Sequence, residues 1–112
     1  MKQHISPKQA KLLTEERFYL LFNDLVYRKD WANYHHKKVT IGKLLEVIKW
    51  FYDLKVISID SNWVVHLFER HSVDEVNEGF ILKQTQDKEL VNALFDGLLW
   101  ILENKKRTGV NE

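Results

Sequence analysis

The apolar pattern changes near the middle of the chain from that of a helix to that of a β-hairpin. Thr40 can cap a helix whose apolar residues recur at helical spacing and therefore line one face. These residues are Ile41, Leu44, Leu45, Ile48, Phe51 and Tyr52. The segments VISID at 56–60 and WVVHLFER at 63–70 are rich in β-branched and aromatic residues, and the Ser61 and Asn62 between them suit a tight turn. A helix followed by a hairpin favours a fold that combines helices with an antiparallel sheet.

Further elements are predicted on both sides of this unit. Ser6 and Gln9 can form a capping box for a helix from Pro7 to about Arg17. Residues 18–22 and 25–28 are interpreted as a short hairpin, although a helix over 18–28 is an open alternative, and residues 29–38 as a polar connection. Residues 72–79 are expected to form an acidic loop, and 80–85 a further strand.

A last helix is expected to start at Thr85, which would act as its cap. Its apolar residues form two neighbouring stripes: Val91, Leu94, Phe95, Leu98, Ile101 and Leu102 in one, and Leu90, Ala93, Gly97 and Trp100 in the other. The small residues Ala93 and Gly97 would allow another backbone to come close. The apolar surface of the central helix is also wider than packing against a single element requires, because Val47, Trp50 and Leu54 lie outside its main stripe.

Together these elements predict an α+β fold, with an antiparallel sheet of three to five strands and two or three helices packed on one face. The chain has 112 residues, of which 45% are hydrophobic, which is enough for one core. We therefore expect a single domain over residues 1–112. Its ordered part should cover about residues 6–104, with loose ends at MKQHI and KKRTGVNE.

Composition excludes several classes of protein. The absence of cysteine rules out disulfides and thiolate metal sites, and no signal-like succession opens the sequence. No uncharged apolar run approaches the roughly 20 residues that span a bilayer. We therefore expect a cytoplasmic protein that does not bind membranes. The net charge is +1, but residues 1–59 carry about +5 and residues 60–112 about −4.

The order of these elements resembles that of a group of small uncharacterised proteins from prophages and mobile elements, common in gut Bacteroidetes. The resemblance lies in AKLLTEERF near the start, IKWFYDL, VISID, WVVHLFE and the last-helix segment TQDKELVNALFDGLLWIL. It covers about residues 10–104 and implies the same fold and a bacterial, mobile-element origin. The His that often follows WF in the group is missing from WFYDLK, and the last helix has fewer Ala. The group has no established activity, so the resemblance implies no catalytic residue.

Neither a metal site nor an enzyme is predicted from the titratable residues. His66 and His71 are an odd number of residues apart, which points their side chains to opposite faces of a strand, and His35 and His36 lack a third ligand at zinc spacing. Asp60 or Glu69 could be paired with His66 in a hydrolytic site. No nucleophile or phosphate-binding motif supports that pairing. We therefore expect no cofactor, and an enzyme with a site near His66 is only the third hypothesis.

A basic and aromatic segment over residues 28–43 is the basis of the second hypothesis, nucleic-acid binding. Cations interleaved with aromatic rings suit phosphate contact together with base stacking. The segment contains Arg28, Lys29, Trp31, Tyr34, Lys37, Lys38 and Lys43, with His35 and His36 among them. The helix, three strands and helix of the C-terminal two-thirds resemble the order in the double-stranded-RNA-binding domain, but the acidic QDKE replaces the basic helix start of that domain.

The first hypothesis is a non-catalytic module that binds another protein, whose identity is open, or a second copy of itself. Four Trp and ten Phe or Tyr are more than a small core readily hides, and exposed aromatic residues are favoured at interfaces. The candidate interface residues are Trp50, Trp63 and Trp100. The interaction would bury an apolar helix face or a sheet edge around them.

Overall fold

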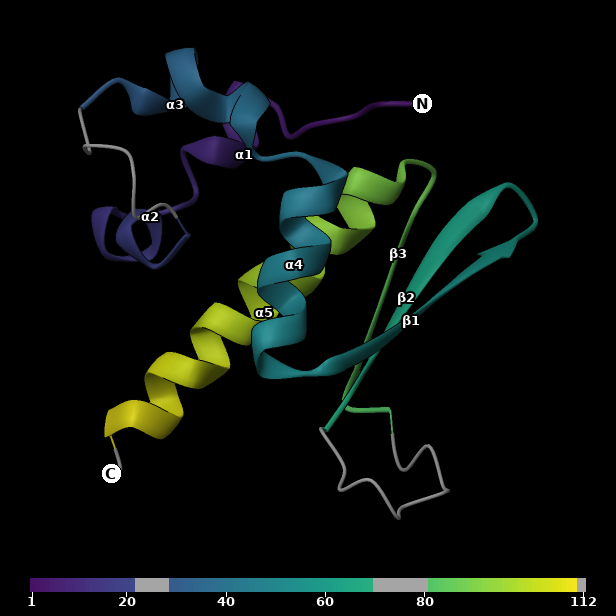
Figure 1. Cartoon of the computed structure of the whole chain (residues 1–112). Helices are drawn as coiled ribbons and strands as arrows, with labels where there is room; N and C mark the ends of the chain where they lie inside the picture. Colours follow the sequence, from purple (N-terminus) through teal and green to yellow (C-terminus); the bar gives the residue numbers. More distant parts are fainter. Residues whose placement is uncertain (22–28, 70–80, 111–112) are drawn as a thin grey trace.

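The computed structural model describes residues 1–21, 29–69 and 81–110, without the side chains at 20, 21 and 105–110 (Figure 1). The elements in chain order are α1 (Pro7–Ala10), α2 (Glu15–Leu21), α3 (Trp31–His35), the 3₁₀ helix η1 (His36–Lys38), α4 (Ile41–Phe51), β1 (Asp53–Ile59), β2 (Asn62–Phe68), β3 (Lys83–Asp87) and α5 (Leu90–Val110). Their combination confirms the predicted α+β class.

The three described strands form one antiparallel sheet in the order β1-β2-β3. Helix α4 packs against β1 and α5, whereas α5 packs against β2 and β3. Both long helices therefore cover the same face of the sheet, as Figure 1 shows. In this layer α4 lies on the side of β1, and β1 forms one edge of the sheet.

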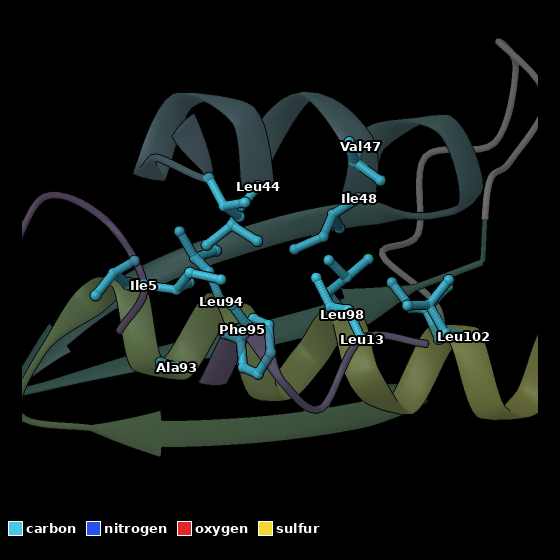
Figure 2. Packing of buried hydrophobic residues seen from close by; sticks show 14 of the residues in the cluster. Ile5, Leu13, Leu44, Val47, Ile48, Ala93, Leu94, Phe95, Leu98 and Leu102 are labelled. Atoms are coloured by element: carbon cyan, nitrogen blue, oxygen red, sulfur yellow. The ribbon is translucent and has the colours of Figure 1, made fainter. Parts of the chain in front are cut away.

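The hydrophobic core lies between these helices and the sheet and continues into the N-terminal segments. Figure 2 shows Leu44, Val47 and Ile48 of α4 opposite Leu94 and Leu98 of α5. The predicted stripe of α5 is confirmed, since all its members are buried: Val91, Leu94, Phe95, Leu98, Ile101 and Leu102. The predicted stripe of α4 is only partly right, because Val47 belongs to the core while Ile41 and Leu45 are partly buried. The buried arc is shifted because α4 contacts both α5 and β1.

The hairpin between β1 and β2 is confirmed, but its turn is one residue earlier than predicted. Ile59 pairs with Asn62, so Asp60 and Ser61 are the two loop residues. Both have positive φ, 47° and 66°. A two-residue turn with positive φ at both positions has the twist that matches antiparallel strands. Asn62 belongs to the strand, which the composition of the turn alone did not reveal.

The predicted helix from Pro7 to Arg17 is wrong, because the chain forms two short helices with a turn at 11–14. The capping box of Ser6 and Gln9 is present as predicted. At the second helix, the Thr14 side chain accepts a hydrogen bond from the Arg17 backbone N–H at 3.3 Å. The break allows both Leu13 and Phe18 to reach the core, which one continuous helix would not.

The predicted strand over 18–22 is wrong for residues 18–21, which belong to helix α2. Residue 22 and the second predicted strand, 25–28, lie outside the described residues, as does the predicted acidic loop at 72–79. Phe18 is fully buried in the core. Tertiary contact therefore decides the conformation of a segment whose apolar run is compatible with either element.

Residues 2–5 were expected to be loose, but they are held by the rest of the chain. His4 forms an antiparallel bridge with Thr40, and Ile5 N–H donates to the Val39 carbonyl at 3.1 Å. The backbone N–H of Lys2 donates to a carboxylate oxygen of Glu89 at 2.8 Å. Ile5 is fully buried. This segment thereby connects the start of α4 with the start of α5.

Thr85 does not cap the last helix, contrary to the prediction. Thr85 lies within β3, and its hydroxyl donates to the Ala93 carbonyl at 2.6 Å. The helix begins at Leu90, and the Glu89 carbonyl accepts its first hydrogen bonds. The third strand accordingly runs over 83–87 instead of 80–85. The short sequence TQDKE contains more than one possible cap, and pairing of β3 with β2 takes Thr85 into the sheet.

The small residues of α5 serve contact with the sheet. A Cβ at Gly97 would lie 3.6 Å from Leu67 Cδ1 and 3.9 Å from Thr85 Oγ1. Ala93 is fully buried and accepts the Thr85 hydrogen bond. The backbone that Ala93 and Gly97 allow to come close is therefore that of the sheet of the same chain.

Candidate binding surfaces

Helix α4 carries an exposed tryptophan, and the outer edge of β1, the strand on which α4 packs, pairs with no described strand. The outward side of α4 carries Glu46, Lys49 and Trp50, and the indole of Trp50 is 44% exposed. Lys43 Nζ lies 5.8 Å from the centre of this ring, a cation–π contact. We call this side of α4 and the outer edge of β1 together the β1-edge surface. A large aromatic side chain with a charged rim is typical of protein interfaces.

The backbone groups at the free edge of β1 follow from the hairpin geometry. Ile59 and Asn62 close a two-residue turn, so they form a hydrogen-bonded pair, and such pairs alternate along an antiparallel ladder. The N–H and C=O groups of Leu54, Val56 and Ser58 then point away from β2. No described strand pairs with β1 on that side. The edge can therefore accept a further strand.

The three predicted interface tryptophans do not form one surface. Trp63 faces the helix side of the sheet, opposite Ser58 and Asp87 near the hairpin turn. Trp100 is half-buried on α5, with its ring 5.9 Å from that of Tyr52. Tyr52 directly precedes β1 and is six residues, or about 20 Å along the strand, from Ser58, the partner of Trp63. Of the three, Trp50 has the most exposed side chain.

The residues of the predicted nucleic-acid-binding segment differ in exposure, and not all of them can reach a ligand. Trp31 is only 2% exposed, and its ring lies 4.9 Å from that of Phe18, so it is a core residue and cannot stack on bases. Tyr34, in contrast, is 71% exposed. Lys29, Lys37 and Lys38 are exposed and Lys43 is half-buried, while Arg28 lies outside the described residues.

The histidines are placed in different parts of the molecule. His66 Nε2 lies 3.0 Å from the amide oxygen of Gln84, and neither Asp60 nor Glu69 is its hydrogen-bond partner. The Nδ1 of His36 donates to the Ala32 carbonyl at 2.9 Å. Nδ1 of His35 is shielded from solvent and has no partner within the described part of the chain. Over residues 1–21, 29–69 and 81–110 no group of His, Asp and Glu has the arrangement of a metal site.

Among the described titratable residues, Asp96 on α5 has a raised pKa, although the residue as a whole is exposed. Burial raises the pKa of the Asp96 carboxyl above its ordinary value, the carboxylate of Asp87 raises it further, and Lys83 partly opposes the change. Asp87 is fixed nearby because its side chain accepts hydrogen bonds from Glu89 N–H and Asn92 Nδ2. Both carboxylates belong to the junction of β3 with α5.

Replacement of Asp96 by asparagine is expected to stabilise the protein slightly at neutral pH. Because the folded pKa is raised, the folded state binds the proton more tightly than the unfolded state, and wild-type stability should increase as the pH falls through the folded pKa. Asparagine carries no charge to desolvate, so the advantage of Asp96→Asn should be complete above that pKa and vanish at acidic pH. Urea unfolding at several pH values measures it, and a constant difference across pH would contradict the assignment.

Comparison with known proteins adds no family to this description. No family model matches the chain, and no curated protein or solved structure shows significant similarity. None of the helices described here has both the length and the apolar character needed to cross a membrane. The candidate surfaces thus rest on the chemistry and geometry of this chain.

Proposed function

We propose that this protein is a non-catalytic protein-binding module that acts as a homodimer through the β1-edge surface. The proposal is carried by exposed Trp50 on α4, the helix that packs on β1, together with the seven-residue length of β1 and its outer edge, which has no described neighbour. The predicted role of Trp50 is thereby retained, whereas Trp100 is assigned to packing against the core and Trp63 lies apart from Trp50, near the hairpin turn. The resemblance to prophage proteins supports a bacterial cytoplasm as the setting.

A second copy is favoured because β1 can pair with itself over its whole length. A two-fold axis beside Val56 would align the strands antiparallel and bring Leu54 opposite Ser58 of the second copy, so that the outward backbone groups of both strands are satisfied. The turn of one copy, with Asp60, would then lie beside the end of α4 in the other, where Lys49 and Trp50 are located. Apolar Ile59, which is 49% exposed, lies at the same end of the strand as this turn.

The proline variant Ser58→Pro is expected to weaken dimerisation. The Ser58 N–H points to the free edge, so its removal leaves the hairpin intact but deletes one intermolecular hydrogen bond per copy. At about 0.5–1.5 kcal/mol for each bond, the Kd should increase by about one to two orders of magnitude. Sedimentation equilibrium of wild type, Ser58→Pro and the control Ser58→Ala, which keeps the N–H, measures this change.

The role of Trp50 is tested in the same experiment. Trp50→Ala should weaken the dimer, whereas Glu46→Ala on the same side of α4 should change it little. Ser58→Ala should behave as wild type. A wild-type protein that stays monomeric over the whole concentration range would refute the homodimer, and a dimer unaffected by both Ser58→Pro and Trp50→Ala would show that another surface is used.

A further inference from the structure

A second surface, distinct from the β1 edge, is formed where the N-terminal segment meets the start of α4. Residues 1–13 and 31–45 contain lysines but neither Asp nor Glu. The structure brings these two segments together: besides the bridge of His4 with Thr40, Ile41 N–H donates to the Gln3 carbonyl at 3.1 Å. Helices α1 and α3 also lie in contact, side by side in Figure 1.

Four lysines of these segments are exposed and have no described acidic partner: Lys8, Lys11, Lys37 and Lys38. We call them the basic end. Lys2 is excluded because its ammonium group is bound to Gln9 and Asn92. Lys43 is excluded because it lies over the ring of Trp50. The positive charge of the basic end is therefore left for a ligand outside the described part of the chain.

Two histidines connect the segments that carry these lysines. The rings of His4 and His36 are 5.5 Å apart, and His36 begins the 3₁₀ helix that also contains Lys37 and Lys38. Lys8 is four residues from His4, so the two Cα atoms are at most about 14 Å apart.

We propose that the basic end binds the phosphate backbone of nucleic acid without reading its sequence. Several lysines without an interspersed carboxylate match a regular array of phosphates. The Nδ1 atoms of His4 and His36 donate to the carbonyls of Ile5 and Ala32, so Nε2 of each ring can donate to a phosphate oxygen only when the ring is protonated. Exposed Tyr34 on α3 adds an aromatic face, a role that buried Trp31 cannot have. Neither β1 nor Trp50 takes part, so this surface is independent of the proposed dimer.

The test is fluorescence anisotropy of the full chain with labelled duplex DNA, duplex RNA and single-stranded DNA at 50, 100 and 200 mM KCl, concentrations chosen to reveal the salt slope. Four phosphate contacts predict a loss of affinity of about a hundredfold over this range on duplex DNA. Lys37→Gln combined with Lys38→Gln should reduce the slope of log K against log salt by about two, and so should Lys8→Gln combined with Lys11→Gln. The three probes distinguish a preference for DNA, RNA or single strands.

The matched control combines Lys83→Gln with Lys88→Gln, which removes the same charge from the junction of β3 with α5. It should leave both affinity and slope unchanged. The proposal is overturned by absence of binding at 50 mM KCl, by equal losses in the control and the basic-end variants, or by binding to phosphatidylserine vesicles without binding to any nucleic acid. Circular dichroism of each variant shows that a lost affinity does not reflect unfolding.

Discussion

Phe95→Ala is expected to lower the free energy of unfolding by about 3–5 kcal/mol. Phe95 is 1% exposed on α5, and Figure 2 shows it within the cluster near Leu94 and Leu98. Truncation removes a ring from the hydrophobic core, and the surrounding backbone cannot close the cavity completely. Urea unfolding followed by tryptophan fluorescence measures the loss, which is a large part of the stability of a domain of this size.

Glu103→Ala is the control for this substitution, since Glu103 is exposed on the same helix. It should change the free energy of unfolding by less than about 0.5 kcal/mol. Equal, small effects of Phe95→Ala and Glu103→Ala would mean that α5 does not pack as described.

Trp31→Ala should produce a comparable loss, about 3–5 kcal/mol. The Trp31 ring joins α3 to α2 through Phe18, so its removal should release the N-terminal helices from the core. Urea unfolding measures the total loss. Hydrogen exchange should show the largest change in α2 and α3 and a smaller one in α5. Uniform loss of protection would contradict a local role.

Trp31→Phe separates packing from ligand stacking at this position. Phenylalanine keeps most of the buried volume, so stability should decrease much less than in Trp31→Ala. Affinity for nucleic acid should stay as in wild type, because the ring does not reach solvent. A selective loss of binding in folded Trp31→Phe would restore the stacking role predicted from the sequence.

The elements predicted from periodicity over many residues are the ones that the structure confirms. Helix α4 starts after Thr40 as predicted, with the threonine side chain accepting from Lys43 N–H. Strands β1 and β2 and the main stripe of α5 are confirmed as well. In these segments local propensity and burial of one face favour the same conformation, so the prediction needs no knowledge of neighbours.

Predictions that depended on a few residues were less accurate. Thr85 has the side chain of a helix cap but is taken into β3 by pairing with Val65. The apolar run at 18–21 suits a strand or a helix, and contact with Trp31 favours the helix. In each case two local structures have similar energies, and the tertiary contact provides the difference.

The candidate surfaces show the same division between sequence and tertiary structure. The excess of apolar and aromatic side chains and the basic first half follow from composition and periodicity alone, because these are properties of the chain. Long-range packing is what buries Trp31 and exposes Trp50, places β1 at an edge of the sheet, and brings His4 beside Thr40. The reason is physical: exposure and proximity depend on which segments pack together, and this packing is set by contacts between residues far apart in the chain.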